Sequence, residues 1–247
     1  MLTRRNLFPA IPGAVLAGAA VAASATQAKA ATPRETIDVH GDMRIHGERF
    51  YQTDFVFRGP DAKIKVCETD GLGPVFDECT FTGYSAQKRG LGVLIGTPGV
   101  KIRACQFSGF IRALDIRSHL FRATECVFRN NVFGVYLDCK RYLPGRGENN
   151  AFMGCSFSGN RVGVLMNRAH ASFIQCSFDY NTRSGAVLLD RSTLRSMHCH
   201  FETEKGYPHV VGSPQREWLD TNSQIHTVRH VGGFSRPHGH VVCEACL

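Results

Sequence analysis

Acidic and basic side chains recur together at four places along the middle of the chain. An aspartate or asparagine lies at or near the end of a short apolar segment, and a cation follows closely: Asp115 with Arg117, Asp138 with Lys140 and Arg141, Asn167 with Arg168, and Asp190 with Arg191. A carboxylate beside a cation can take part in general acid–base chemistry, and the planar arginine fork can hold a substrate carboxylate at two points. These residues are therefore the first candidates for a catalytic or binding surface.

A polar insertion follows Asp138. It runs from Cys139 to Asn150 and contains Lys140, Arg141, Tyr142 and Arg146 among glycines and a proline. Three cations and an aromatic side chain would suit the rim of a binding groove, with Tyr142 and Arg146 contacting substrate. The alternative is a solvated turn whose alternating charges only stabilise a long excursion.

The C-terminal residues include four candidate metal ligands, His238, His240, Cys243 and Cys246. A divalent cation could be held there, although zinc ligands usually come as two separated pairs. A Cys243–Cys246 disulfide, or two capping thiols, is the favoured alternative, and the sequence requires no cofactor.

The elements that must position these residues follow from a repeat. Cys-x-Phe occurs six times at intervals of 21 to 29 residues, with cysteines at 79, 105, 126, 155, 176 and 199. Apolar residues at i and i+2 indicate a strand with Cys and Phe on one face, and turn residues such as Ser158-Gly159-Asn160 follow nearly every copy. A second short apolar run, of which Gly134–Asp138 is typical, completes each unit. Units of this kind without a helical period predict an all-β parallel β-helix of about six or seven rungs, in which equivalent side chains stack.

The Cys-x-Phe and Gly-Val-x-Leu-Asp/Asn copies resemble the right-handed parallel β-helix proteins of the pectate-lyase-like superfamily, from about Val56 to Phe201. The resemblance implies one rung per unit, but the same rungs serve lyases, hydrolases, epimerases and non-catalytic binders. We expect residues 31–55 to cap the first rung, residues 56–201 to form the β-helix, and residues 202–247 to form a C-terminal cap.

On such a stack, Gly96, Asp138, Asn167 and Asp190 should lie in one column, with Asp115 near the same edge. Adjacent-rung acids such as Asp115 and Asp138 would be roughly 5 Å apart, and Asp138 and Asp190 roughly 10 Å apart, so that both the retaining and the inverting glycosidase spacings are available. In a lyase, Lys140, Arg141, Arg146 or Arg168 would remove the proton next to a uronate carboxyl or neutralise that carboxyl. The aspartates could equally be structural, because Asp and Asn suit β-helix turns.

Residues 1–30 have the order of a signal peptide: a basic start, a weakly apolar run, and small residues at Ala28 and Ala30. Arg4 and Arg5 followed by Leu7 and Phe8 resemble the twin-arginine signal, which implies folding in a reducing cytoplasm before export to the periplasm or beyond. A stable membrane anchor is not expected, because Pro9, Pro12 and small residues interrupt a run that is too short to span. The six repeat cysteines are therefore predicted to be reduced and buried.

Composition narrows the function. The chain has 247 residues, 43% of them hydrophobic, and its formal charge of +8 falls to about +5 once residues 1–30 are removed. Interleaved charges and an export signal make nucleic acid a poor fit. The sequence favours an exported protein that acts on polysaccharide, with lyase-type cleavage of an acidic glycan ahead of a non-catalytic glycan- or protein-binding module of the cell envelope and of a glycoside hydrolase. No motif indicates an oligomeric state.

Overall fold

The computed structural model describes residues 33–84, 90–139, 149–203, 210–212, 217–221, 224–227 and 240–243, with side chains described as far as residue 202. All the described strands lie in one compact unit, Arg34–Leu247. The described residues form no helix. Accordingly, they include no helix with the length and apolar character needed to cross a membrane.

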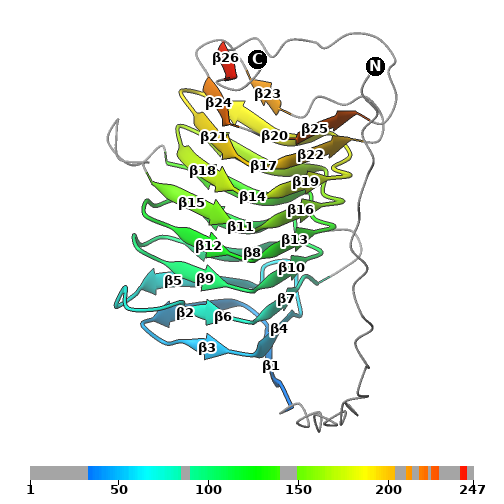
Figure 1. Cartoon of the computed structure of the whole chain (residues 1–247). Coiled ribbons are helices and arrows are strands. Elements are labelled where there is room, and N and C mark those ends of the chain that lie inside the picture. The colour runs from blue at the N-terminus through cyan, green and yellow to red at the C-terminus, as the bar shows by residue number, and fades with distance from the viewer. Residues whose placement is uncertain are drawn as a thin grey trace, which may run out of the picture. The chain divides into compact units, whose positions relative to one another are not determined.

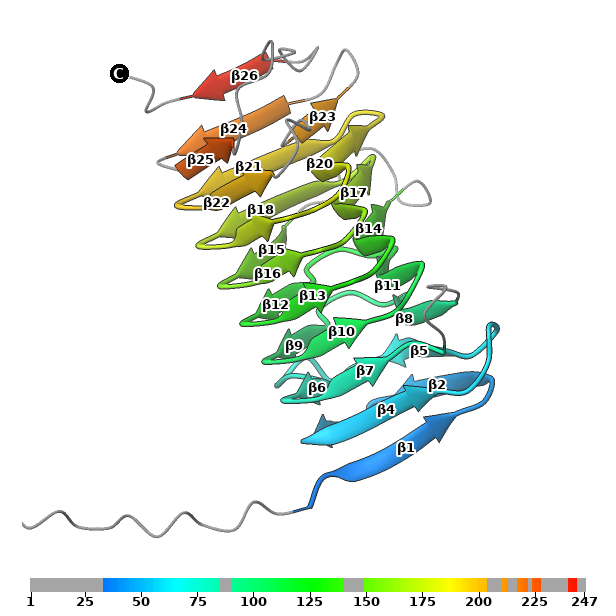
Figure 2. The same cartoon turned by 90° about the vertical axis from the view of Figure 1, so that its right-hand side faces the viewer.

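Three parallel sheets make up the fold, which confirms the predicted parallel β-helix (Figures 1 and 2). Sheet A contains β1 (Glu35–Val39), β4 (Thr53–Phe57), β7 (Thr80–Thr82), β10 (Gln106–Ser108), β13 (Val127–Arg129), β16 (Ser156–Ser158), β19 (Ser177–Asp179), β22 (His200–Thr203) and β25 (Gln224–Thr227). Sheet B contains β2 (Asp42–His46), β5 (Lys63–Glu68), β8 (Leu91–Ile95), β11 (Arg112–Ile116), β14 (Phe133–Asp138), β17 (Val162–Asn167), β20 (Ser184–Leu189) and β23 (Val210–Gly212). Sheet C contains β3 (Phe50–Tyr51), β6 (Phe76–Asp77), β9 (Lys101–Arg103), β12 (Arg122–Thr124), β15 (Asn150–Met153), β18 (His170–Ile174), β21 (Thr193–Met197), β24 (Glu217–Thr221) and β26 (His240–Cys243).

The parallel pairing extends beyond the predicted limits of 56 and 201. The segment predicted as an N-terminal cap contains β1 to β3, and β1 pairs with β4 over five residues. The segment predicted as a C-terminal cap contains β23 to β26, which continue all three sheets. Residues at both ends therefore add strands to the stack.

The phenylalanines of the repeat form a ladder inside the stack. The rings of Phe55, Phe81, Phe107, Phe128, Phe157, Phe178 and Phe201 follow one another with centroids 4.4 to 5.1 Å apart and planes within 11° of parallel. A second run, Phe152 and Phe173, meets this ladder at steep angles. Each ring is almost completely buried, and truncation of one buried phenylalanine typically costs about 3–5 kcal/mol. The ladder therefore fixes the register of the outer side chains.

The repeat cysteines lie at the corner between sheets C and A. All six are buried free thiols, as predicted, and each follows a residue with positive φ, such as Glu125 before Cys126. Cys126 donates a weak hydrogen bond from Sγ to the Thr124 carbonyl at 3.3 Å, and Glu125 N–H donates to the Met153 carbonyl of the next rung at 2.8 Å. Burial raises the pKa of the Cys126 thiol well above its ordinary value, and hydrogen bonding with Cys105 and Cys155 acts in the same direction. These cysteines thus serve as small apolar corner residues.

Three buried asparagines hold the turn between sheets A and B. Asn131 Nδ2 donates to Asn160 Oδ1 at 3.1 Å, and Asn160 Nδ2 donates to Asn181 Oδ1 at 3.2 Å. Asn160 Oδ1 also accepts a hydrogen bond from the backbone N–H of Asn131 at 3.0 Å, and Asn181 Oδ1 accepts one from the backbone N–H of Asn160 at 3.1 Å. Each asparagine lies a few residues before a strand of sheet B, so this ladder positions the outer face of that sheet.

Candidate functional site

Sheet B carries a charged cluster on its outer face, centred on Asp115 of β11. Arg117 approaches both oxygens of Asp115, Nε to Oδ1 at 3.1 Å and Nη2 to Oδ2 at 3.1 Å, and Arg112 Nη1 lies 3.1 Å from Oδ2. Asp115 is 1% exposed, whereas the side chains of Arg112 and Arg117 are 30% and 39% exposed. The buried carboxylate therefore holds two guanidinium groups at the surface.

The next rung extends this cluster with an aromatic ring. Tyr136 of β14 lies in register with Asp115, and Arg112 Cζ lies 3.8 Å from the centroid of its ring, a cation–π contact. The Tyr136 hydroxyl donates to Asp138 Oδ2 at 3.3 Å. Asp138 in turn pairs in register with Asn167 of β17, whose Nδ2 donates to Asp138 Oδ1 at 3.4 Å. Arg112, Asp115, Arg117, Tyr136, Asp138 and Asn167 together are called the sheet B cluster below.

The electrostatics of the sheet B cluster favour binding of an anion by arginine. The ion pair with Asp115 raises the pKa of the Arg117 guanidinium, which stays charged. Burial, followed by the negative charge of Asp138, raises the pKa of Tyr136, so that its hydroxyl remains a neutral donor. Because Asp115 is 1% exposed and both of its oxygens contact arginine, it is placed to position these cations rather than to reach a glycosidic bond.

The predicted column of Asp and Asn is only partly correct. Asp138 and Asn167 do pair, but Asn167 pairs on its other side with Leu189. The prediction that Asp190 stacks with them is wrong, because five positions separate Gly185 from Asp190, whereas four separate Gly163 from Asn167. The extra residue moves Asp190 beyond the strand and into the turn.

Asp190 has a different partner in that turn. It forms an ion pair with Arg168, and the Arg168 N–H donates to the Asp190 carbonyl at 2.8 Å. Arg168, Asp190 and Arg191 all have positive φ. The structure therefore places the candidates Arg168, Asp190 and Arg191 in the turns directly after β17 and β20, outside the strands of sheet B.

Several sequence candidates lie outside the described residues. They are Lys140, Arg141, Tyr142 and Arg146 of the insertion and, at the C-terminus, His238 and Cys246, together with the side chains of His240 and Cys243.

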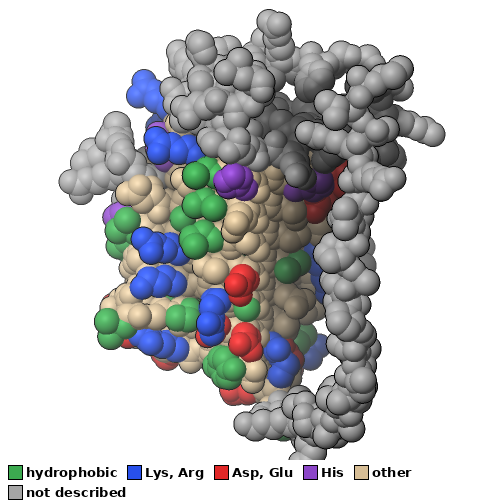
Figure 3. Space-filling model, viewed as in Figure 1, with side chains coloured by type: hydrophobic (Ala, Val, Ile, Leu, Met, Phe, Trp, Pro, Cys, Tyr) green, Lys and Arg blue, Asp and Glu red, His purple; other side chains and the backbone are tan. Residues whose placement is uncertain are grey.

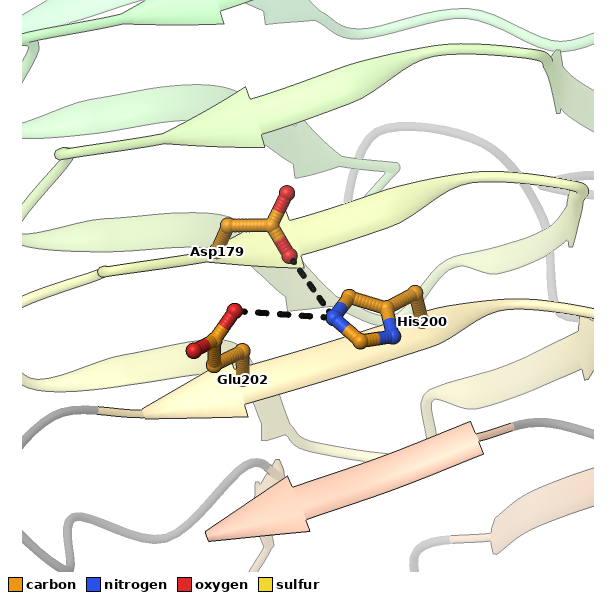
Figure 4. A group of neighbouring side chains, drawn as sticks. All are labelled: Asp179, His200 and Glu202. Carbon is orange, nitrogen blue, oxygen red and sulfur yellow. Dashed lines mark ion pairs between the residues drawn. The ribbon is translucent and has the colours of Figure 1, made fainter. Parts of the chain in front are cut away.

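A second cluster, on the outer face of sheet A, was missed in the sequence. His200 Nε2 lies 3.7 Å from Asp179 Oδ1 and 3.6 Å from Glu202 Oε2 (Figure 4). Asp179 comes from β19, and His200 and Glu202 come from the neighbouring strand β22, with Asp179 and Glu202 in register. A signal for it exists in the sequence, because these residues flank the ladder phenylalanines Phe178 and Phe201 at outward positions of the repeat.

Sheet C carries a cavity of about 320 Å³ over the first residues of three adjacent interior strands. Its lining comes from β15, β18 and β21 and the residue before β15: Asn149, Asn150, His170, Ala171, Ser172, Thr193 and Arg195. On the face of the molecule shown in Figure 3, Lys and Arg are separated by hydrophobic and uncharged side chains. The described side chains of that face therefore do not form a continuous basic surface of the kind that tracks a nucleic-acid backbone.

Comparison with known proteins gives no family. No protein-family model matches the chain, and no curated protein matches it. Among solved structures, it is similar to the full-length tailspike protein 2 of Escherichia coli O157:H7 bacteriophage CAB120, with a TM-score of 0.45, 9% identity and coverage of 78% of this chain and 35% of that one. It is also similar to the enzymatically active domain of tailspike protein 2 of bacteriophage CBA120, with a TM-score of 0.38, 11% identity and coverage of 78% and 39%. This chain thus spans little more than a third of the length of either protein.

Proposed function

We propose that the sheet B cluster binds an acidic polysaccharide. The observation that carries this proposal is the pair of exposed guanidinium groups, Arg112 and Arg117, held by the buried carboxylate of Asp115. Arginine binds carboxylates through parallel hydrogen bonds, and a side chain already held in place loses less entropy on binding. Tyr136, Asp138 and Asn167 in the following rungs offer donors and acceptors for sugar hydroxyls, so that a chain lying along the stack would meet one rung after another.

The catalytic form of this proposal is lyase-type cleavage. Arg112 or Arg117 would neutralise the uronate carboxyl and so make the adjacent proton acidic, and Lys140 or Arg141 of the insertion after Asp138 would remove that proton. The bond to the leaving sugar oxygen would break as the new double bond forms, and that oxygen would take a proton from water and leave as a hydroxyl group. Loss of turnover in Lys140→Ala or Arg141→Ala, with no change in melting temperature, would support this role for the insertion, and unchanged turnover would exclude it.

A non-catalytic binding module is the second candidate. It is favoured because two candidate catalytic acids already form ion pairs within the protein: Asp115 with Arg112 and Arg117, and Asp190 with Arg168. Incubation with a panel of uronate polymers separates the two candidates. The ultraviolet absorbance of an unsaturated uronide indicates the lyase, whereas binding without that product and without new reducing ends indicates the module.

Substitution of the arginines tests the binding site itself. Arg117→Gln and Arg112→Gln should each weaken binding of a uronate polymer about 10- to 100-fold, because a charge-assisted hydrogen bond contributes about 1.5–3 kcal/mol. Arg122→Gln, on the outer face of sheet C, is the matched control and should bind normally. Equal affinity of the wild-type protein for a neutral polymer of the same linkage would overturn the acidic specificity.

We further propose that residues 1–30 direct export of the folded chain to the periplasm or the medium, where such a polymer would be met. Arg4→Lys with Arg5→Lys should retain the protein in the cytoplasm, because the twin-arginine route requires the paired arginines. Unchanged export of the double variant, measured by fractionation of cells, would exclude that route.

A further inference from the structure

We propose that Asp179, His200 and Glu202 form a binding site for a divalent transition-metal ion, with Zn²⁺ as its first candidate. The site lies on sheet A and is independent of the polysaccharide surface proposed on sheet B. It differs also from the C-terminal His and Cys residues considered in the sequence.

The distances fit three ligands around one ion. One ligand atom from each residue lies within 4.8 Å of the other two, and the two separations from His200 Nε2 are 3.7 and 3.6 Å. Zinc ligands at about 2.0–2.2 Å in tetrahedral geometry are about 3.3–3.6 Å apart. Small rotations of the side chains would therefore bring the three atoms onto one ion.

The donor set selects the class of ion. Imidazole nitrogen suits zinc and the neighbouring transition metals, whereas Ca²⁺ and Mg²⁺ prefer an all-oxygen shell. Two carboxylates supply the negative charge that a divalent ion requires. Three protein ligands leave a fourth position open to water or to a substrate oxygen.

Two of the three groups in the cluster are acids, and His200 lies within ion-pair distance of both. Asp179 and Glu202 are carboxylates in register on adjacent strands, an arrangement that repels when both are ionised. Asp179 Oδ1 is inaccessible to solvent and receives no hydrogen bond from the described residues, and His200 at 3.7 Å is too distant to donate one. A cation between these groups would satisfy Asp179 and remove the repulsion.

The framework holds the three residues ready for the ion. His200 and Glu202 flank Phe201, and Asp179 follows Phe178, and these two rings stack 4.6 Å apart in the buried ladder. The half-buried side chains therefore project from a fixed backbone, which is the preorganisation that a metal site needs.

Binding of ZnCl2 and CoCl2 to the tag-free full chain, followed by calorimetry and native mass spectrometry, tests the proposal. We expect one ion per chain at this site, binding at least 100-fold weaker in Asp179→Asn and Glu202→Gln, and loss of the visible Co²⁺ absorption in His200→Gln. The matched control is His46→Gln, because His46 Nδ1 lies 3.8 Å from Glu68 Oε1 and the described residues add no third ligand to form a group like that of Asp179, His200 and Glu202. That variant should keep the ion.

A double variant, Cys243→Ser with Cys246→Ser, separates this site from the C-terminus and should also keep one ion. The proposal is overturned if the wild-type chain binds neither ion, if His46→Gln loses as much affinity as Glu202→Gln, or if only the double cysteine variant loses the ion. Far-UV circular dichroism checks that each variant is folded. If Asp179→Asn does not fold, the affinity of Glu202→Gln for the ion tests the proposed site instead. Failure of polysaccharide binding would leave this result unaffected, because the two assays use different residues and probes.

Discussion

Substitution of Asn160 by alanine is expected to destabilise the stack by about 4 kcal/mol. The change removes four hydrogen bonds: two accepted by Oδ1 from Asn131, at 3.0 and 3.1 Å, and two donated by Nδ2, to the Phe128 carbonyl at 2.8 Å and to Asn181 Oδ1 at 3.2 Å. At about 1 kcal/mol each, the net loss is about 4 kcal/mol. The bond from the Asn160 backbone N–H to Asn181 Oδ1 does not depend on the side chain and is retained.

The effect of Asn160→Ala should also be local. In a solenoid each rung contacts only its neighbours, so the rungs on either side of the substituted turn lose protection first. Guanidinium unfolding followed by circular dichroism gives the total change. Hydrogen exchange of amides in β14 and β17 shows whether the loss is centred on the strands that carry Tyr136, Asp138 and Asn167.

Arg161→Ala is the matched control, since Arg161 follows Asn160 directly and its side chain is exposed. That substitution should change stability by less than about 0.5 kcal/mol. A loss below about 1 kcal/mol in Asn160→Ala, or equal losses in the two variants, would refute the assignment of the asparagine ladder as the support of sheet B.

Three further predictions concern packing, the thiols and the anchor of the arginines. Gly163→Ala should cost about 1–3 kcal/mol in chemical unfolding, because its Cβ would lie 2.5 Å from the Gly185 carbonyl oxygen, whereas Gly41→Ala, with nothing within 4 Å, should not destabilise the protein. Burial raises the pKa of Cys139 to about 11, above the ordinary 9.0, so this thiol should resist alkylation at pH 8, and its contribution to stability should be lost as the pH rises through that interval. Asp115→Asn should reduce polysaccharide binding as strongly as Arg117→Gln and lower the melting temperature as well, because it breaks a buried ion-paired carboxylate; unchanged binding would show that the arginines need no anchor.

The fold could be predicted because its core repeats in the sequence. Cys-x-Phe marks the same inward positions in six successive rungs, and the structure places each of those phenylalanines in one stack. The repeat could not reveal the outer rungs, where other residues take the same places. Thr53 occupies the corner position in the first sheet A pairing, buried and donating through Oγ1 to the Tyr51 carbonyl at 3.1 Å, much as the cysteines do. A hydroxyl can replace a thiol at this position, so the residue type in the motif changes while the geometry of the corner is kept.

The site was harder to predict because it depends on the register between strands, and one inserted residue changes which side chains lie next to each other. Counting from the opening glycine placed Asp138 beside Asn167 correctly but misplaced Asp190, since one extra residue in β20 moves it from the sheet into a turn. From the sequence alone, Asp115 and Asp138 were equal candidates for a catalytic acid. Only side-chain geometry shows that Arg112 and Arg117 enclose Asp115. Asp115 therefore positions the two arginines and is no longer a candidate for the catalytic acid.

The two proposed sites share one physical origin. A rung offers each outward side chain a neighbour about 4.8 Å away in the next rung, and two carboxylates at that spacing repel unless a cation compensates them. On sheet B, Asp115 stacks on Tyr136 rather than on a second acid, and its charge is compensated by Arg112 of the same strand and by Arg117 just after it, whose side chains are partly exposed to an anionic ligand. On sheet A, His200 Nε2 lies 3.7 Å from Asp179 Oδ1 and 3.6 Å from Glu202 Oε2, beyond hydrogen-bonding distance of both, and in the proposed site a bound ion would join these three groups. The two proposals thus differ in how the acid is compensated: by arginine on sheet B, where we propose that an anion binds, and without arginine on sheet A, where we propose that a cation binds.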